Sequence, residues 1–183
     1  MAFIAQTAFL PRIWNNRNDD IQNFAGKFFN GSDAAADCSA GYFVVKGDHM
    51  VGGGYKFTEA ADSTGDVYIC NPGDVQRLSN GENLWAVGKN TLGLGIPAGV
   101  MGTFSKAKPG ETYAFGDGNF STLVDATTNV YATIDDGLLV GTSTAPEAGS
   151  GIYFKLDAAL GIDVWTEGDT VAFNRYNMLC LEA

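Results

Sequence analysis

The sequence has few residues of the kinds that most catalytic and metal sites require. Among its 183 residues there are one histidine, His49, and three cysteines, Cys38, Cys70 and Cys180. The cysteines lie far apart and form neither a CxxC nor a Cys/His spacing, so we expect no bound metal. An odd number of cysteines without a secretion signal indicates assembly in a reducing cytoplasm.

Basic residues and long apolar runs are also scarce. The chain carries 11 Lys and Arg against 21 Asp and Glu, a formal net charge of −10. Binding to nucleic acids or to anionic membranes depends on clusters of Lys and Arg, and the basic residues here are dispersed. No window approaches the ~18 consecutive apolar residues of a membrane-spanning helix. We therefore expect neither a nucleic acid nor a membrane as partner.

The first 40 residues differ in pattern from the rest of the chain, and we predict an N-terminal arm and one short helix there. Asn18 is a suitable N-cap residue. Ile21, Phe24 and Phe28 follow at i, i+3 and i+7, which places them on one face of a helix that ends near Gly31.

From Gly41 onward, short apolar runs alternate with Gly, Asn, Asp and Pro, and 24 glycines indicate many tight turns. This pattern predicts a mainly-β domain over 41–183, a Gly-rich β-sandwich or barrel of short antiparallel strands. Asp135-Asp136-Gly137 is typical of a hairpin turn. The expected strands are 42–46, 66–70, 84–87, 112–115, 130–134, 138–141, 152–156 and 171–181.

Several polar segments share features with known sites, and none has the full pattern. His49 has no nucleophile signature beside it. Gly52-Gly53-Gly54 lacks the GxxxxGK[ST] spacing of a phosphate-binding loop, so we read it as a loop or hairpin tip. Asp117-Gly118-Asn119 and Asp135-Asp136-Gly137 offer oxygen ligands to calcium, but turn chemistry explains both. We expect no catalytic residue, no cofactor and no enzymatic activity.

Several segments together carry a resemblance to a known class of proteins. They are 41–45 (GYFVV), 67–72 (VYICNP), 108–117 (KPGETYAFGD), 139–146 (LVGTSTAP) with 149–154 (GSGIYF), and 171–179 (VAFNRYNML). In these segments the chain resembles small bacteriophage virion proteins of the head-decoration or auxiliary-capsid kind. The resemblance implies a structural virion protein that binds the outside of a phage capsid and stabilises or decorates it. It also implies the major capsid protein or other virion subunits as partners, and a homo-oligomer, with a trimer suited to a three-fold position.

The N-terminal arm is the expected interface in such an assembly. Ordering it against a neighbouring subunit buries Phe3, Phe9, Leu10, Ile13 and Trp14, and this burial favours association. An interface on the order of 800 Å² per partner is sufficient for specific binding.

Two other classes stay open from the sequence. A tail, baseplate or head-fibre protein shares these features. A carbohydrate-binding or hydrolytic β-sandwich is the alternative outside phage structure, with Trp14, Trp85 and Trp165 as candidate sugar platforms. Each tryptophan lies in an apolar context that favours packing, and nothing singles out a catalytic pair of carboxylates.

Overall fold

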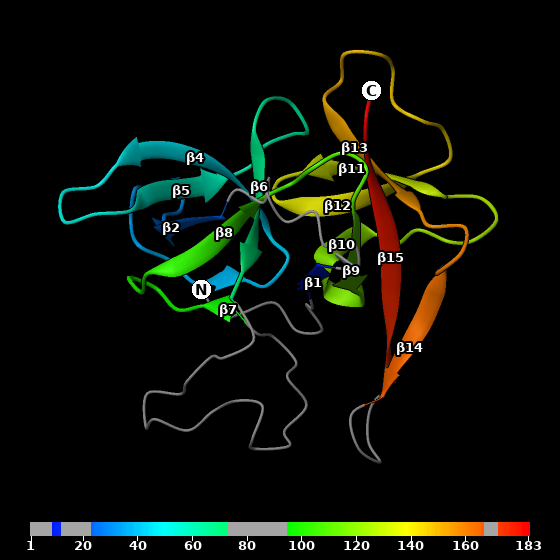
Figure 1. Cartoon of the computed structure of the whole chain (residues 1–183), viewed down its shortest axis with the longest axis horizontal. Helices are drawn as coiled ribbons and strands as arrows, with labels where there is room; N and C mark the ends of the chain where they lie inside the picture. Colours follow the sequence, from blue (N-terminus) through cyan, green and yellow to red (C-terminus); the bar gives the residue numbers. More distant parts are fainter. Residues whose placement is uncertain (1–8, 12–22, 73–94, 167–171) are drawn as a thin grey trace.

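Figure 1 shows the computed structural model of the chain, which describes residues 9–11, 23–72, 95–166 and 172–183. These residues contain fifteen strands, one 3-10 turn (Asp117–Asn119) and no α-helix. The protein is therefore mainly β, as the sequence predicts. None of the described helical segments has the length and apolarity of a membrane span.

Five strands close into a barrel, which lies on the left in Figure 1. β2 (Asn23–Phe28) runs parallel to β5 (Tyr55–Glu59), and the other four pairs in the barrel are antiparallel. Closure leaves no unpaired strand edge in this part of the molecule. The barrel strands, in order around it, are β2 (Asn23–Phe28), β5 (Tyr55–Glu59), β4 (Phe43–His49), β6 (Val67–Asn71) and β8 (Gly102–Lys106).

Eight further strands form an open sheet on the right in Figure 1. The long β15 (Ala172–Glu182) pairs with β9 (Thr112–Gly116) along one side. Along the other side it pairs with both β13 (Ile152–Leu156) and β14 (Ile162–Thr166). A two-stranded pair, β3 (Cys38–Ser39) with β7 (Gly95–Ile96), is not hydrogen-bonded into either of the two bodies, the barrel and the open sheet, but Cys38 and Ile96 pack in the barrel core. The strand order of the sheet is β1 (Phe9–Pro11), β9 (Thr112–Gly116), β15, β13 (Ile152–Leu156), β11 (Tyr131–Asp135), β12 (Leu138–Thr142) and β10 (Phe120–Thr122).

Strand β6 is buried on both faces over residues 67–70, and so is the start of β4 at Phe43 and Val44, which explains why these two segments are apolar without interruption. Successive side chains of a strand point to opposite faces. Phe43 and Ile69 therefore join the core between barrel and sheet, whereas Val44 and Cys70 join the core inside the barrel. An uninterrupted apolar run is the sequence signature of a strand that is covered on both sides.

Close packing inside the barrel requires a glycine in β2. The rings of Phe57 and Phe104 stack there with centroids 4.0 Å apart. A Cβ atom at Gly26 would lie 2.4 Å from both a carbon of the Phe57 ring and the carbonyl oxygen of Tyr55. Since real side chains do not approach so closely, only glycine lets β2 lie against these rings.

Seven of the eight expected strands are confirmed, as β4, β6, β9, β11, β12, β13 and β15, and the segment 84–87 lies outside the described residues. The expected hairpin turn is also confirmed. Ile134 pairs with Leu139 across it, and the two central residues, Asp136 and Gly137, have φ values of 46° and 75°. Positive φ at both positions is characteristic of a type I′ turn.

The predicted short helix is wrong, because Asn23–Phe28 is strand β2. Phe24 and Phe28 are four residues apart, a spacing that places two side chains on one face in a strand as well as in a helix. Both pack in the barrel core. Pairing with β5 and β8 selects the strand, and β2 and β3 thereby join residues before Gly41 to strands that follow it.

The three cysteines are free and buried, and they serve as small core residues. Cys38 and Cys70 lie in the barrel core, and Cys180 lies in the core between the two bodies. Burial raises the pKa of the Cys180 thiol to about 12, and burial also raises the pKa of Cys38. These two thiols therefore stay protonated near neutral pH.

Candidate functional site

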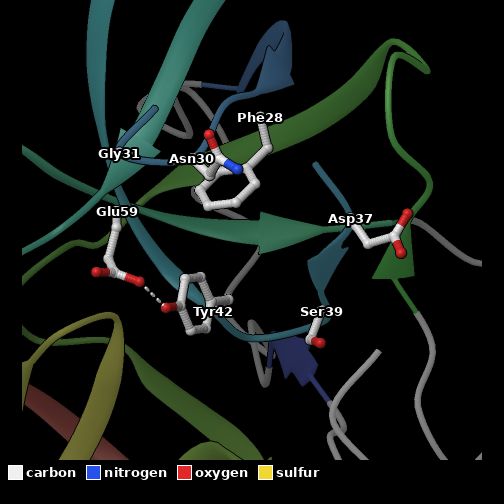
Figure 2. A pocket seen from close by; sticks show the side chains of 7 residues that line it. All are labelled: Phe28, Asn30, Gly31, Asp37, Ser39, Tyr42 and Glu59. Atoms are coloured by element: carbon white, nitrogen blue, oxygen red, sulfur yellow. Dashed lines mark hydrogen bonds between the residues drawn. The ribbon is translucent and has the colours of Figure 1, made fainter. Parts of the chain in front are cut away.

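A pocket of about 210 Å³ opens beside the barrel, where the chain leaves β2 and where β5 ends. Figure 2 shows that its walls combine two aromatic rings with two carboxylates. It is lined by Phe28, Asn30, Gly31, Asp37, Ser39, Tyr42 and Glu59.

The apolar part of the pocket consists of the rings of Phe28 and Tyr42. They meet edge to face, with centroids 5.9 Å apart and planes at 85°. Phe28 is buried because it belongs to the barrel core, and the half-buried Tyr42 packs against that core. The barrel therefore holds one ring rigidly, and this ring supports the other.

A hydrogen bond joins the ring of Tyr42 to the first carboxylate. The Tyr42 hydroxyl donates to the Glu59 side chain and lies 3.1 Å from a second acceptor, the carbonyl oxygen of Asp136. Burial raises the pKa of Tyr42 well above its usual range, and the bond to Glu59 adds to the shift. The hydroxyl therefore remains a donor at neutral pH, and it holds the exposed Glu59 at the pocket rim.

The turn between β11 and β12 helps to place Tyr42. A Cβ atom at Gly137 would lie 2.3 Å from Cζ of Tyr42, so the ring takes its position only because residue 137 lacks a side chain. The backbone N–H of Phe43 also donates to the carbonyl oxygen of Gly137 at 3.0 Å. The open sheet thus reaches the barrel at this pocket and fixes one of its walls.

The second carboxylate belongs to Asp37, whose Oδ1 accepts the backbone N–H of Ala98 at 2.8 Å. In Figure 2, Asp37 and Glu59 lie on opposite sides of the two rings. Between them, Asn30 Oδ1 accepts the backbone N–H groups of Ser32 at 3.0 Å and Ala34 at 3.1 Å, which fixes the turn after β2. The pocket therefore has negative groups at its sides and an aromatic centre.

A second candidate site is the apolar stripe formed by Leu160, Ile162 and Val164, which are 47, 39 and 56% exposed. Ile162 and Val164 alternate along β14 and so share one face. Asp163 points to the opposite face, where it forms an ion pair with Arg175. Within the described part of the chain β14 pairs only with β15, and Figure 1 shows this ribbon extending away from the barrel.

Two of the five predicted interface residues are described. Phe9 and Leu10 lie in β1, in register with Phe115 and Ala114 of β9. The other three, Phe3, Ile13 and Trp14, lie outside the described residues, as does Trp85. The role of the arm in assembly stays a prediction.

The segments that the sequence analysis assigned to turns and loops have structural roles. Gly52-Gly53-Gly54 forms the tip between β4 and β5, closed by a 2.8 Å bond from the Met50 N–H to the Gly54 carbonyl oxygen, so the hairpin-tip prediction is confirmed. His49, at the end of β4, meets Tyr55 edge to face at 5.3 Å. Asp117 accepts a hydrogen bond from the Tyr176 hydroxyl at 2.9 Å.

Across the described ranges, no three His, Cys, Asp or Glu side chains gather as metal ligands would.

No sequence pattern indicated this pocket. Tyr42 and Glu59 are 17 residues apart and form no motif. The one signal was the aromatic Tyr42 at the start of a strongly apolar run, and it did not indicate which carboxylate lies beside it.

Comparison with known proteins adds no relative, since no family model, no curated protein and no solved structure matches this chain.

Proposed function

We propose that this protein is a structural subunit of a bacteriophage virion that binds the outside of the capsid and stabilises or decorates it. The observation that carries the proposal is the exposed apolar stripe of Ile162 and Val164 on β14, with Leu160 just before it, on a strand that pairs on one side only among the described strands. Single exposed apolar residues are ordinary, but a row of them on a projecting edge strand is typical of a surface that contacts another protein.

The sequence supports the capsid as the partner. The likeness to head-decoration proteins lies in segments such as 41–45 and 139–146, which contribute to β4 and β12 in the structure. An unpaired strand edge also suits attachment to a protein shell, because a partner strand can add to it by main-chain hydrogen bonds while the apolar side chains are buried. Oligomerisation on the shell then adds avidity to a modest single interface.

Co-sedimentation with purified capsids that lack this protein tests the proposal. We expect the native protein to sediment with the capsids, and electron microscopy to place it on their outer surface. The double variant Ile162→Asp, Val164→Asp should lose binding, because two charges enter the contact. Val51→Asp is the matched control, since Val51 is fully exposed at the tip of the β4–β5 hairpin. A native protein that stays in the supernatant, or sediments only with tails, contradicts the proposal.

We propose the N-terminal arm as a second contact. Replacing Phe3, Ile13 and Trp14 together by Asp leaves the pairing of β1 with β9 in place and removes the apolar side chains on either side of β1. We expect this variant to fold, as judged by circular dichroism, and to bind capsids more weakly. Unchanged capsid binding and an unchanged oligomeric mass would show that the arm is dispensable.

A further inference from the structure

We propose that the pocket formed by Phe28, Tyr42 and Glu59 receives a lysine or arginine side chain of the partner protein and thereby anchors the two proteins. The inference relies on the proposed function only for the identity of the partner. The chemistry of the occupant follows from the pocket itself, through its size, its rings and its charge.

The size of the pocket favours a side-chain tip. Its volume is about 210 Å³. Pockets for drug-sized ligands are larger, roughly 300–1,000 Å³. One long side chain therefore suits this pocket better than an oligosaccharide or a nucleotide.

The rings and carboxylates favour a cation. Ring faces attract ammonium and guanidinium groups, and a carboxylate compensates such a group for its lost hydration. One oxygen of Glu59 accepts the Tyr42 hydroxyl, which leaves the other oxygen of this exposed side chain able to accept from a ligand. None of the seven lining residues is basic and two are acidic, so the charge of the lining disfavours an anion.

The same barrel already holds two of its own ammonium groups by this chemistry. Nζ of Lys46 lies 4.1 Å from the ring centroid of Phe24 and 4.7 Å from that of Tyr55. Nζ of Lys56 lies 5.3 Å from the centroid of Phe29 and forms an ion pair with Asp33. Lys56 is thus held by an aromatic ring and a carboxylate. The pocket offers the same two kinds of group to a cationic side chain of a partner. A chain with a net charge of −10 further favours a basic partner surface.

NMR titration with small probes tests the chemistry of the occupant. The probes are the Nα-acetyl N-methylamides of lysine, arginine and norleucine, together with methyl glucoside as a neutral sugar. We expect the two basic probes to shift the amide signals of Gly31, Ser39 and Tyr42, with dissociation constants on the order of millimolar. Equal shifts from norleucine or from the glucoside, or no shift from either basic probe, would overturn the inference.

Charge removal at the rim tests the carboxylate. Glu59→Gln retains an acceptor for the Tyr42 hydroxyl and removes the charge, so we expect binding of the lysine probe to weaken about tenfold. Glu147→Gln, the same change at an exposed carboxylate outside the pocket lining, should leave this affinity unchanged. An unaltered affinity in Glu59→Gln overturns the assignment.

Capsid co-sedimentation of the same variants separates this inference from the proposed function. Glu59→Gln should weaken capsid binding, and the Ile162→Asp, Val164→Asp variant should still bind the lysine probe. If the native protein binds the basic probes but does not sediment with capsids, the capsid is not the partner, and the proposed function is overturned. Capsid binding without any probe binding overturns the role of the pocket.

Discussion

The barrel and the open sheet satisfy their backbone hydrogen bonds in different ways. Each barrel strand has a neighbour on both sides, so this body presents no strand edge to solvent. The sheet leaves β14 paired on one side only among the described strands, and its exposed side chains there are apolar. The closed body therefore offers a partner a pocket at its rim, whereas the open body offers a strand edge and an apolar face.

The two bodies nevertheless depend on one shared core. Phe43 and Ile69 of the barrel pack in the same cluster as Phe115 and Phe154 of the sheet. Because β4 and β6 contribute alternate residues to the barrel core and to this shared core, loss of either core affects the other. We therefore expect the two bodies to unfold together.

The largest loss in the free energy of unfolding is expected from Phe43→Ala, which removes a ring between the barrel and the open sheet. The centroid of Phe43 lies 5.5 Å from that of Phe115 and 5.3 Å from that of Phe154. Truncation of such a buried ring destabilises by about 4 kcal/mol. Urea unfolding followed by circular dichroism and by NMR should show one transition at lower urea. Separate transitions for barrel and sheet would contradict the shared core.

A smaller effect, confined at its origin to the barrel, is expected from Gly26→Ala. The added methyl would overlap the Phe57 ring and the Tyr55 carbonyl oxygen. Because backbone cannot move aside, we expect a loss of about 3 kcal/mol in the free energy of unfolding. Gly31→Ala is the matched control, since a Cβ atom at that position would have no neighbour within 4 Å. Surface changes of this kind alter stability by about 0.5 kcal/mol or less.

Gly137→Ala tests the point where the sheet meets the barrel. Its φ of 75° disfavours a side chain, and the new Cβ would displace the Tyr42 ring. We expect a loss of about 2 kcal/mol from strain and overlap together, with weaker binding of the lysine probe. Gly65→Ala has a similar φ of 74° and open space around it, so it isolates the conformational strain. Equal losses in both variants would show that Tyr42 is not held by the turn.

The smallest expected change in stability concerns the pH dependence of an exposed turn in the open sheet. Backbone N–H groups of Thr128, Thr127 and Asn129 donate to Asp125 and lower its pKa to about 2. An unfolded Asp has a pKa of about 3.9. Since the folded pKa is the lower one, the carboxylate stabilises the turn above pH ~4, and this contribution is lost as the pH falls towards 2. An NMR titration of the Asp125 carboxyl should give this low midpoint, and a midpoint near 4 would contradict the turn bonds.

Local patterns made much of the fold predictable. Strand β13 has the same bounds as the expected 152–156, because the alternation of IYFKL is bordered by glycine and aspartate. The Asp136-Gly137 turn was predictable for a similar reason, since few dipeptides accept two positive φ values. Strands β2 and β8 were not recognised, and each contains a glycine that a neighbouring side chain, Phe57 or Ile96, requires.

The candidate sites were less predictable than the fold. Ile162 and Val164 alternate in sequence as they do in β14, but alternation does not reveal whether a face is covered. The pocket depends on the pairing of β4 with β5 and on the approach of the β11–β12 turn to Tyr42. Neither contact follows from residues that are close in the chain.

The sequence by itself determined the mainly-β character, the hairpin turn at Asp136-Gly137 and the approximate ranges of seven strands. These properties depend on φ preferences and on period-two burial, which act within a few residues. Only the tertiary structure decided that five strands close into a barrel, that β2 lies parallel to β5, and that β14 keeps a free edge among the described strands. Periodicity specifies which side chains share a face, whereas the partner of each face depends on long-range packing.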